Sequence, residues 1–177
     1  MRKVMLAISI IALVISFNGQ AQSYPNQPIR LVIPFAAGGP SDVLARGFSQ
    51  KLGESLGQPI IIDNKPGAGT NLAADFVAKS KADGYTIFLM MVGTQAINET
   101  LYKKLSYNTI KDFSPISLVA SSSLMLVANP SVPVKNVADL IAYSKANPGK
   151  INFGSSGTGT PLHLGGELFN VQAGTTL

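Results

Sequence analysis

The chain has 177 residues, a net charge of +5, no cysteine and a single histidine, His163. Without cysteine the chain forms no disulfides, ligates no zinc through thiolates and performs no thiol catalysis. One histidine also excludes a multi-histidine metal site within one chain, and the scattered basic residues form no stripe typical of nucleic-acid binding. We therefore expect an ordinary hydrophobic core, no metal, and no nucleic-acid partner.

Residues 1–21 are typical of a secretory signal peptide. Arg2 and Lys3 precede a 14-residue apolar run, and small residues stand at the −3 and −1 positions of a cleavage site. The run is shorter than the ~20 residues that usually span a bilayer, which disfavours a retained membrane anchor. Without Arg2 and Lys3, the 14 basic residues become 12 against 9 acidic ones, so the exported chain carries +3.

Three strand–loop–helix units are predicted in succession. The predicted strands are 29–35, 59–62 and 85–91, and the predicted helices are 40–56, a helix capped by Thr70 or Asn71, and a short helix near 96–103. The first strand is a near-continuous apolar run, as in a buried parallel sheet. Strands that alternate with helices in this way predict an α/β fold.

The sequence changes character after Tyr107. Two short β-like runs, 113–119 and 124–128, precede a helix that Asn136 caps and Pro148-Gly149 ends. A strand at 151–153 and a helix that starts at Thr160 and Pro161 follow. We place a domain boundary between about 107 and 130, with a first α/β lobe in 22–120 and the start of a second lobe in 121–177.

Four loops follow predicted strands and precede predicted helices: 35–42, 63–71, 92–96 and 154–161. In an open α/β sheet such loops lie at the carboxyl edge, where ligands bind. Their free N–H groups at helix N-termini attract anions. Ordinary turns are the simpler alternative, but glycine-rich loops that open two distinct domains favour binding.

Specific nucleotide and hydrolase motifs are missing from these loops. No lysine follows the glycines, which excludes a Walker loop. Gly67-Ala68-Gly69 begins like a dinucleotide fingerprint, but Leu72 stands in the place of the third glycine. The GxSxG nucleophile elbow does not occur.

Two catalytic alternatives stay open at this point. Ser155 or Ser156, with His163 and an aspartate, could act as a triad in an exported hydrolase or transferase. Asp42 could act as a general base. We favour the interpretation that Asp42 is a first-turn acid that satisfies loop N–H groups or orients water.

Four segments together resemble one family. They are YPNQPIRLVIPFAAGGPSDVLAR (24–46), LGQPIIIDNKPGAGTNLAADFVAKSKADGYTIFL (56–89), FSPISLVA (113–120) and LMLVANPSVPVKNVADLIAYSKANPGKINFGSSGTGTPLHLGGELF (124–169). With the export signal, they resemble the tripartite tricarboxylate transporter receptor family, also called Bug proteins. The resemblance extends over essentially the whole exported chain.

The resemblance implies a two-lobe periplasmic-binding-protein-like fold that closes over a small carboxylate. It implies a monomeric periplasmic receptor for membrane transporter subunits, without cofactor or enzyme activity. A sensory binding protein for the same ligand class is a further alternative. Complete members continue beyond the segment that matches 165–177, so we expect an incomplete first lobe and a second lobe only begun, in a fragment or a truncated reading frame.

The resemblance also implies a set of ligand-binding residues on three loops. Backbone N–H groups would hold the carboxylate, and Asp42 would act partly through ordered water. The residues implied are Phe35, Ala36, Ala37, Gly38, Gly39, Ser41 and Asp42 on the first loop, Gly93, Thr94 and Gln95 on the second, and Ser155, Ser156, Gly157, Thr158, Gly159 and Thr160 with His163 on the third.

Overall fold

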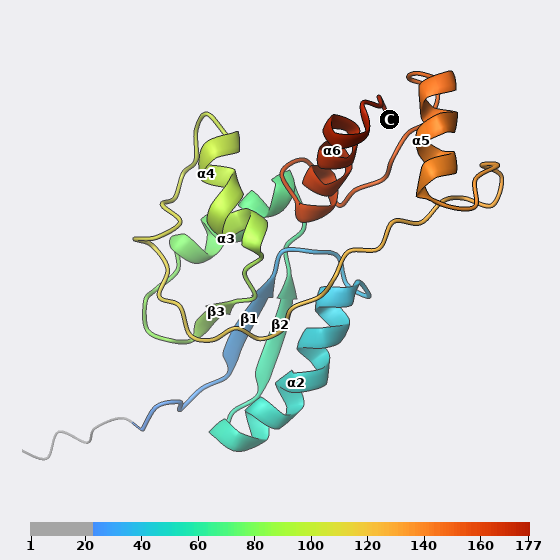
Figure 1. Cartoon of the computed structure of the whole chain (residues 1–177). Coiled ribbons are helices and arrows are strands. Elements are labelled where there is room, and N and C mark those ends of the chain that lie inside the picture. Colours follow the sequence, from blue (N-terminus) through green and yellow to red (C-terminus); the bar gives the residue numbers. More distant parts are fainter. Residues whose placement is uncertain (1–22) are drawn as a thin grey trace, which may run out of the picture.

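The computed structural model describes residues 23–177 (Figure 1). The predicted signal peptide, 1–21, lies outside the described residues. No helix in 23–177 combines the length and the apolar character that are needed to cross a bilayer.

A three-stranded parallel sheet forms the centre of the first part of the chain. β1 (Ile29–Ile33) lies between β2 (Ile60–Asn64) and β3 (Thr86–Phe88). Leu31 is aligned with Ile62 on one side and with Ile87 on the other. The predicted α/β class and the parallel arrangement are confirmed, although β3 is shorter than the expected strand 85–91.

Helices cover both faces of this sheet. α2 (Pro40–Leu56) places Ala45 against Leu31 and Ile33, and these three residues form the buried cluster on one face. α3 (Asn71–Ala78) lies on the other face, where its Phe76 ring meets the guanidinium of Arg30. Because successive strand residues point to opposite faces, the odd positions of β1 face α2 and the even positions face α3.

The ends of α2 match the sequence signals. Pro40 occupies the first turn, and Gly57 ends the helix in a left-handed conformation with its N–H directed at the Gly53 carbonyl. Its buried stripe consists of Asp42, Ala45 and Ser49, which are small or short side chains. Small residues at this spacing let the helix axis lie close to the sheet.

The loop after β3 turns into helix earlier than expected. A π-helical turn, η2 (Gly93–Ile97), leads directly into α4 (Asn98–Leu101), whereas the sequence predicted a loop at 93–95 and a helix at 96–103. The N–H of Gln95 already donates to the carbonyl of Met91, which starts the helical turn before Gly93 is passed.

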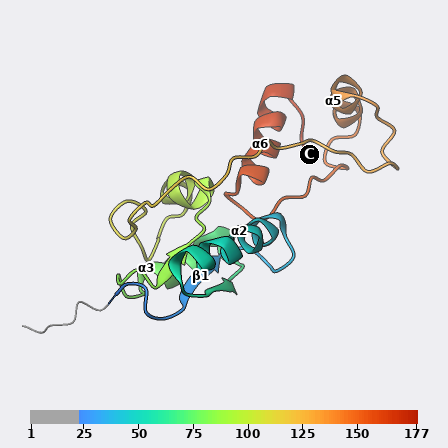
Figure 2. The same cartoon turned by 90° about the horizontal axis from the view of Figure 1, so that it is seen from below.

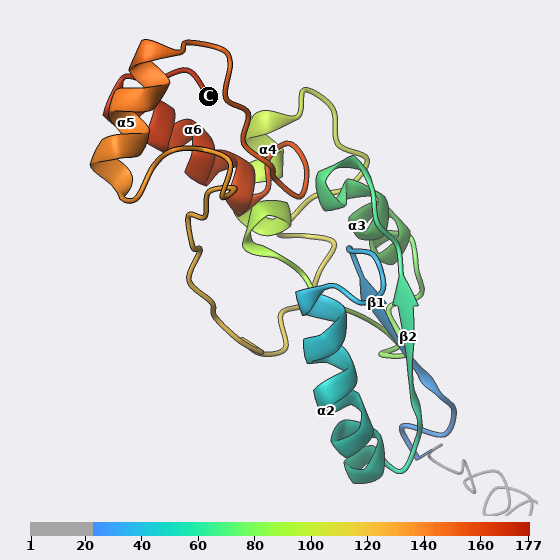
Figure 3. The same cartoon turned by 90° about the vertical axis from the view of Figure 1, so that its right-hand side faces the viewer.

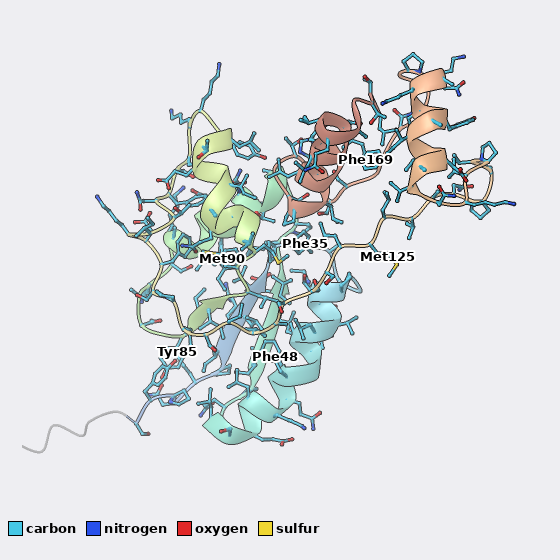
Figure 4. The ribbon with its side chains drawn as sticks, in the orientation of Figure 1. Phe35, Phe48, Tyr85, Met90, Met125 and Phe169 are labelled. Atoms are coloured by element: carbon cyan, nitrogen blue, oxygen red, sulfur yellow. The ribbon has the colours of Figure 1, made fainter. Side chains whose placement is uncertain are left out.

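The predicted strands 113–119, 124–128 and 151–153 are wrong: none of these segments is a strand in the structure. Ile116, Leu118 and Met125 are 82%, 84% and 83% exposed, and Figure 4 shows Met125 on an extended stretch of chain. A strand exists only where a neighbouring strand accepts and donates its backbone hydrogen bonds. Within residues 23–177 these apolar runs have no such neighbour.

Two helices follow, and both begin where the sequence predicted. Asn136 caps α5 (Val137–Ala146) by accepting the Asp139 N–H at 2.9 Å, and Thr160 caps α6 (Pro161–Ala173). The two helices lie beside each other and apart from the sheet (Figures 1 and 2). Their ends meet where the Gly149 N–H donates to the Thr176 carbonyl at 3.3 Å.

The burial of two isoleucines in neighbouring strands predicts different losses in the free energy of unfolding when each is replaced by alanine. Ile33 is fully buried, whereas Ile61 is 53% exposed. Ile33→Ala should lower the free energy of unfolding by about 2–5 kcal/mol because it removes buried methylene groups and leaves a cavity. The matched control Ile61→Ala should cost much less. Urea unfolding followed by circular dichroism measures both, and equal losses would contradict the assigned faces.

Candidate functional site

The loops that follow the three strands meet at one end of the sheet because the strands are parallel. Figure 1 shows this carboxyl edge facing the start of α6, and Figure 3 shows the same arrangement from the side. Phe35, the first residue of the loop 35–42, lies at this edge in Figure 4. The predicted binding loops on the first part of the chain therefore share one end of the sheet, as expected for an open α/β sheet.

The carboxylate of Asp42 organises the loop 35–42. It accepts hydrogen bonds from the Gly38 N–H at 2.9 Å, from Arg46 Nε and Nη2 at 2.8 and 3.0 Å, and from Asn64 Nδ2 at 3.1 Å. The Asn64 amide also donates to the Phe35 carbonyl at 3.0 Å. The side chain of Asp42 is only 3% exposed. One buried carboxylate thus ties together the loop, α2 and the end of β2.

These donors stabilise the ionised form of Asp42. Hydrogen bonds from the Arg46 guanidinium, then from the Gly38 N–H, hold the pKa of the Asp42 carboxyl far below its usual range. The prediction that Asp42 satisfies a loop N–H is confirmed by the Gly38 contact. A carboxylate with so low a pKa is a poor proton acceptor near neutral pH, which disfavours the general-base alternative.

The loop 35–42 exposes part of its backbone, whereas its acid is buried. Ala36, Ala37 and Gly38 are exposed at the edge of the sheet. The Gly38 N–H is already used by Asp42, and the Gly39 N–H approaches the Ala36 carbonyl at 3.4 Å. A ligand at this loop would meet exposed main chain together with the N-terminal end of α2.

The side chain of Thr94 points into the protein, whereas Gln95 is exposed. Thr94 is fully buried, and its hydroxyl lies 2.5 Å from that of Thr70. Gln95 Nε2 donates to the Thr109 carbonyl at 3.1 Å. Both side chains help to anchor η2, but only Thr94 is buried, so a ligand contact predicted for Thr94 would have to come from its backbone.

The loop 154–160 combines exposed hydroxyls with an internally bonded end. Ser155, Ser156 and Thr158 are exposed. Thr160 donates from Oγ1 to the Gly157 carbonyl at 2.7 Å and accepts the His163 N–H at 3.4 Å, which closes the first turn of α6. The sequence expected His163 to lie near this loop, and the cap places it there.

The imidazole of His163 lies next to Glu167 and Phe153. Its Nε2 is 3.9 Å from a Glu167 carboxylate oxygen, and its ring centre is 6.2 Å from that of Phe153. Within residues 23–177 it makes no hydrogen bond to Ser155 or Ser156. The nucleophile–base contact of a catalytic triad is therefore not formed, which disfavours the serine hydrolase alternative.

The structure brings the loop 154–160 onto the loops that follow β2 and β3. The hydroxyl of Tyr102 donates to the Thr158 carbonyl at 3.1 Å. A Cβ atom on Gly93 would lie 3.1 Å from the Gly159 carbonyl oxygen, so the two backbones are in direct contact there. No contact of this kind joins the loop 35–42 to the loop 154–160 among the described residues.

The sequence did not predict that Gly69, Asn98 and Tyr102 meet the loop 154–160. Gly69 lies in the loop 63–71, which was predicted to lie at the ligand-binding edge of the sheet but not to contact another loop. Asn98 and Tyr102 carry no local signal because their role depends on a segment more than 50 positions away. Residues 23–177 contain no group of three His, Asp or Glu side chains that could hold a metal ion.

The family model for the tripartite tricarboxylate transporter family receptor matches residues 44–177. The chain belongs to this receptor family. Among curated relatives, it is 39% identical over 169 residues to a UPF0065 protein of Bordetella pertussis, covering 96% of this chain and 52% of that protein. It is 38% identical to protein BugT of the same organism, covering 89% of this chain and 48% of BugT.

Solved structures of receptors share the fold. MatC from Rhodopseudomonas palustris with bound malate matches with a TM-score of 0.80 at 33% identity, over 86% of this chain and 52% of MatC. R. palustris Rpa4515 with adipate matches with a TM-score of 0.77 at 36% identity, over 87% and 52%. Periplasmic binding protein BugD matches with a TM-score of 0.76 at 34% identity, over 87% and 51%. The chain spans about half the length of the relatives it matches.

The buried Asp42 cluster predicts an acid-dependent loss of stability. Folding lowers the pKa of this carboxyl, so ionised Asp42 contributes fully to the free energy of unfolding above its unfolded-state pKa of about 4. This contribution is lost as the pH falls below that value toward the folded-state pKa. Asp42→Asn should therefore lower the urea midpoint at pH 7, and the gap to the parent should shrink below about pH 4. Asp83→Asn, at an exposed turn, is the control and should follow the parent at every pH. If the difference in urea midpoint between Asp42→Asn and the parent stays constant with pH, the lowered pKa assigned to Asp42 is contradicted.

Proposed function

We propose that this chain is part of an exported receptor that captures a small carboxylate for a tripartite tricarboxylate-type transporter. The ligand would bind at the carboxyl edge of the sheet, between the loop 35–42 and the loop 154–160. The single observation that carries the proposal is that both loops lie at one end of the sheet in a member of this receptor family. Periplasmic location follows from the predicted export signal and from the family.

The geometry suits an anion with one or two carboxylates. α2 and α6 both begin at this end, and the N-terminus of a helix carries a partial positive charge of about half an elementary charge. A hydrogen bond to a charged group contributes about 1.5–3 kcal/mol, and micromolar affinity needs about 8 kcal/mol. A few main-chain bonds from two loops therefore suffice. Two of the related receptors were solved with diacids, malate and adipate.

The domain division is part of this proposal. Residues 22–120 would belong to a first lobe, and residues 121–177 would begin a second lobe that contributes the loop 154–160. This division is supported by the position of α5 and α6, which lie apart from the sheet (Figure 2). Delivery to membrane transporter subunits, rather than to a sensory kinase, rests on the family description.

The proposal predicts binding of diacids by the exported chain, residues 22–177. Malate and adipate, tested separately by calorimetry and by thermal unfolding, should give a midpoint that rises with ligand concentration, because a ligand that binds only the folded state stabilises it. Citrate and nicotinate extend the panel to other carboxylate classes. A cooperative unfolding transition whose midpoint none of these acids raises would contradict the proposal.

A charge placed in the loop 35–42 tests where the ligand binds. Ala36→Asp adds a negative charge to the exposed loop backbone and should weaken carboxylate binding about tenfold or more by repulsion. The matched control is Ala82→Asp, at an exposed position before the amino end of β3, which should leave affinity unchanged. Equal affinities for both variants would place the ligand elsewhere.

A further inference from the structure

Three glycines form the contact between the loop 157–160 and the first part of the chain. A Cβ on Gly69 would lie 2.5 Å from the Thr158 carbonyl oxygen, and one on Gly159 would lie 2.5 Å from Leu101 Cδ2. A Cβ on Gly93 would lie 3.1 Å from the Gly159 carbonyl oxygen. At Gly69 the Cβ would meet backbone, whereas at Gly159 it would meet the movable end of a leucine side chain. Both residues also have a positive φ, +59° and +84°, which L side chains rarely adopt, so both positions favour glycine. We call Gly69, Gly93 and Gly159 the glycine seam.

Two polar side chains, those of Tyr102 and Asn98, support the glycine seam with hydrogen bonds. The Tyr102 hydroxyl donates to the Thr158 carbonyl at 3.1 Å. Asn98 is fully buried, and its Nδ2 donates to Asn71 Oδ1 at 2.7 Å and to the Gly69 carbonyl at 3.2 Å. These bonds hold the Gly69 backbone in the shape that receives Thr158. The seam is therefore a main-chain contact supported by side chains from α4 and the residue that follows it.

The start of α6 is buried at its cap residue, Thr160, but not along the helix itself. None of its residues, 161–173, is buried. Leu162, Leu168 and Val171 are 43%, 56% and 79% exposed. The glycine seam and Tyr102 join this end of α6 to η2, to α4 and to the loop after β2. These contacts therefore help to set the orientation of the loop.

We propose that the glycine seam positions the loop 157–160 before any ligand arrives, with Gly93 and Tyr102 as positioning residues. For a carboxylate site, the benefit, which rests on the proposed function, is that the loop would lose less conformational entropy when the ligand binds. A loop already held in place loses less conformational freedom on binding. Because Gly93 belongs to η2 and Gly159 to the other loop, the seam also sets the distance between two predicted binding loops.

A pair of spin labels tests the position of the loop directly. The chain has no native cysteine, so Lys51→Cys on α2 and Val171→Cys on α6, both exposed, can be labelled selectively. Pulsed electron resonance on the doubly labelled full chain without ligand should give one narrow distance distribution. Adding Gly93→Ala and Tyr102→Phe should broaden that distribution, because the new Cβ would crowd the Gly159 carbonyl at 3.1 Å and the Tyr102 hydrogen bond is lost.

The matched control is Gly47→Ala, inside α2, where a Cβ meets no atom within 4 Å. Both glycines lie in helical turns, so helix propensity acts in the same direction on each, and the seam variant differs from the control in the contacts of Gly93 and Tyr102. Gly47→Ala should keep the narrow distribution. A broad distribution in the parent, or a narrow one in the seam variant, overturns the proposal.

Ligand binding then separates the seam from the proposed function. Tyr102→Phe alone should weaken binding of malate or adipate about three- to tenfold, the effect of one lost hydrogen bond, with little change in the unfolding midpoint. Full affinity in Tyr102→Phe would overturn the positioning role. If the parent distribution is narrow but neither acid binds, the seam stands as a structural contact while its role in binding and the proposed function both fail.

Discussion

The buried carboxylate of Asp42 holds together the loop after β1, the start of α2 and the end of β2. Asp42 sits in the first turn of α2, binds the loop after β1 through Gly38, and reaches the end of β2 through Asn64. Arg46 compensates its charge from one helical turn away. A buried ion is tolerated only when its lone pairs are satisfied, and here four donors fix the loop 35–42 against the sheet.

The parallel sheet and the starts of α2, α5 and α6 could be predicted because their signals are local, whereas the helical segment after β3 could not. The apolar run 29–33, Pro40 and Gly57 at the ends of α2, and Asn136 before α5 each act within a few residues. The convergence of the strand-following loops also followed from the sequence, because parallel strands end at one edge. The role of Asp42 as an acceptor for a loop N–H was predictable on the same grounds.

Two kinds of feature could not be read from local pattern. The β-rich runs 113–119 and 124–128 have the composition of strands, yet a strand also needs a neighbour, and composition does not name one. The contact between the loop 157–160 and the residues Gly69, Gly93 and Tyr102 joins segments far apart in sequence. Glycine content suggested turns or ligands at these positions, whereas the structure uses the missing side chains to let two backbones touch.

The glycine seam has a consequence for how binding preference could diverge among receptors of this kind. Its surfaces are carbonyl oxygens and α-carbons, which are the same whatever side chains surround them. Substitutions at exposed positions such as Ser155, Ser156 and Thr158 could therefore alter ligand preference without altering the frame that holds the loop. The glycines themselves tolerate less change, because side chains there would crowd the facing loop, so changes in ligand preference would fall mainly on the exposed residues of the loops.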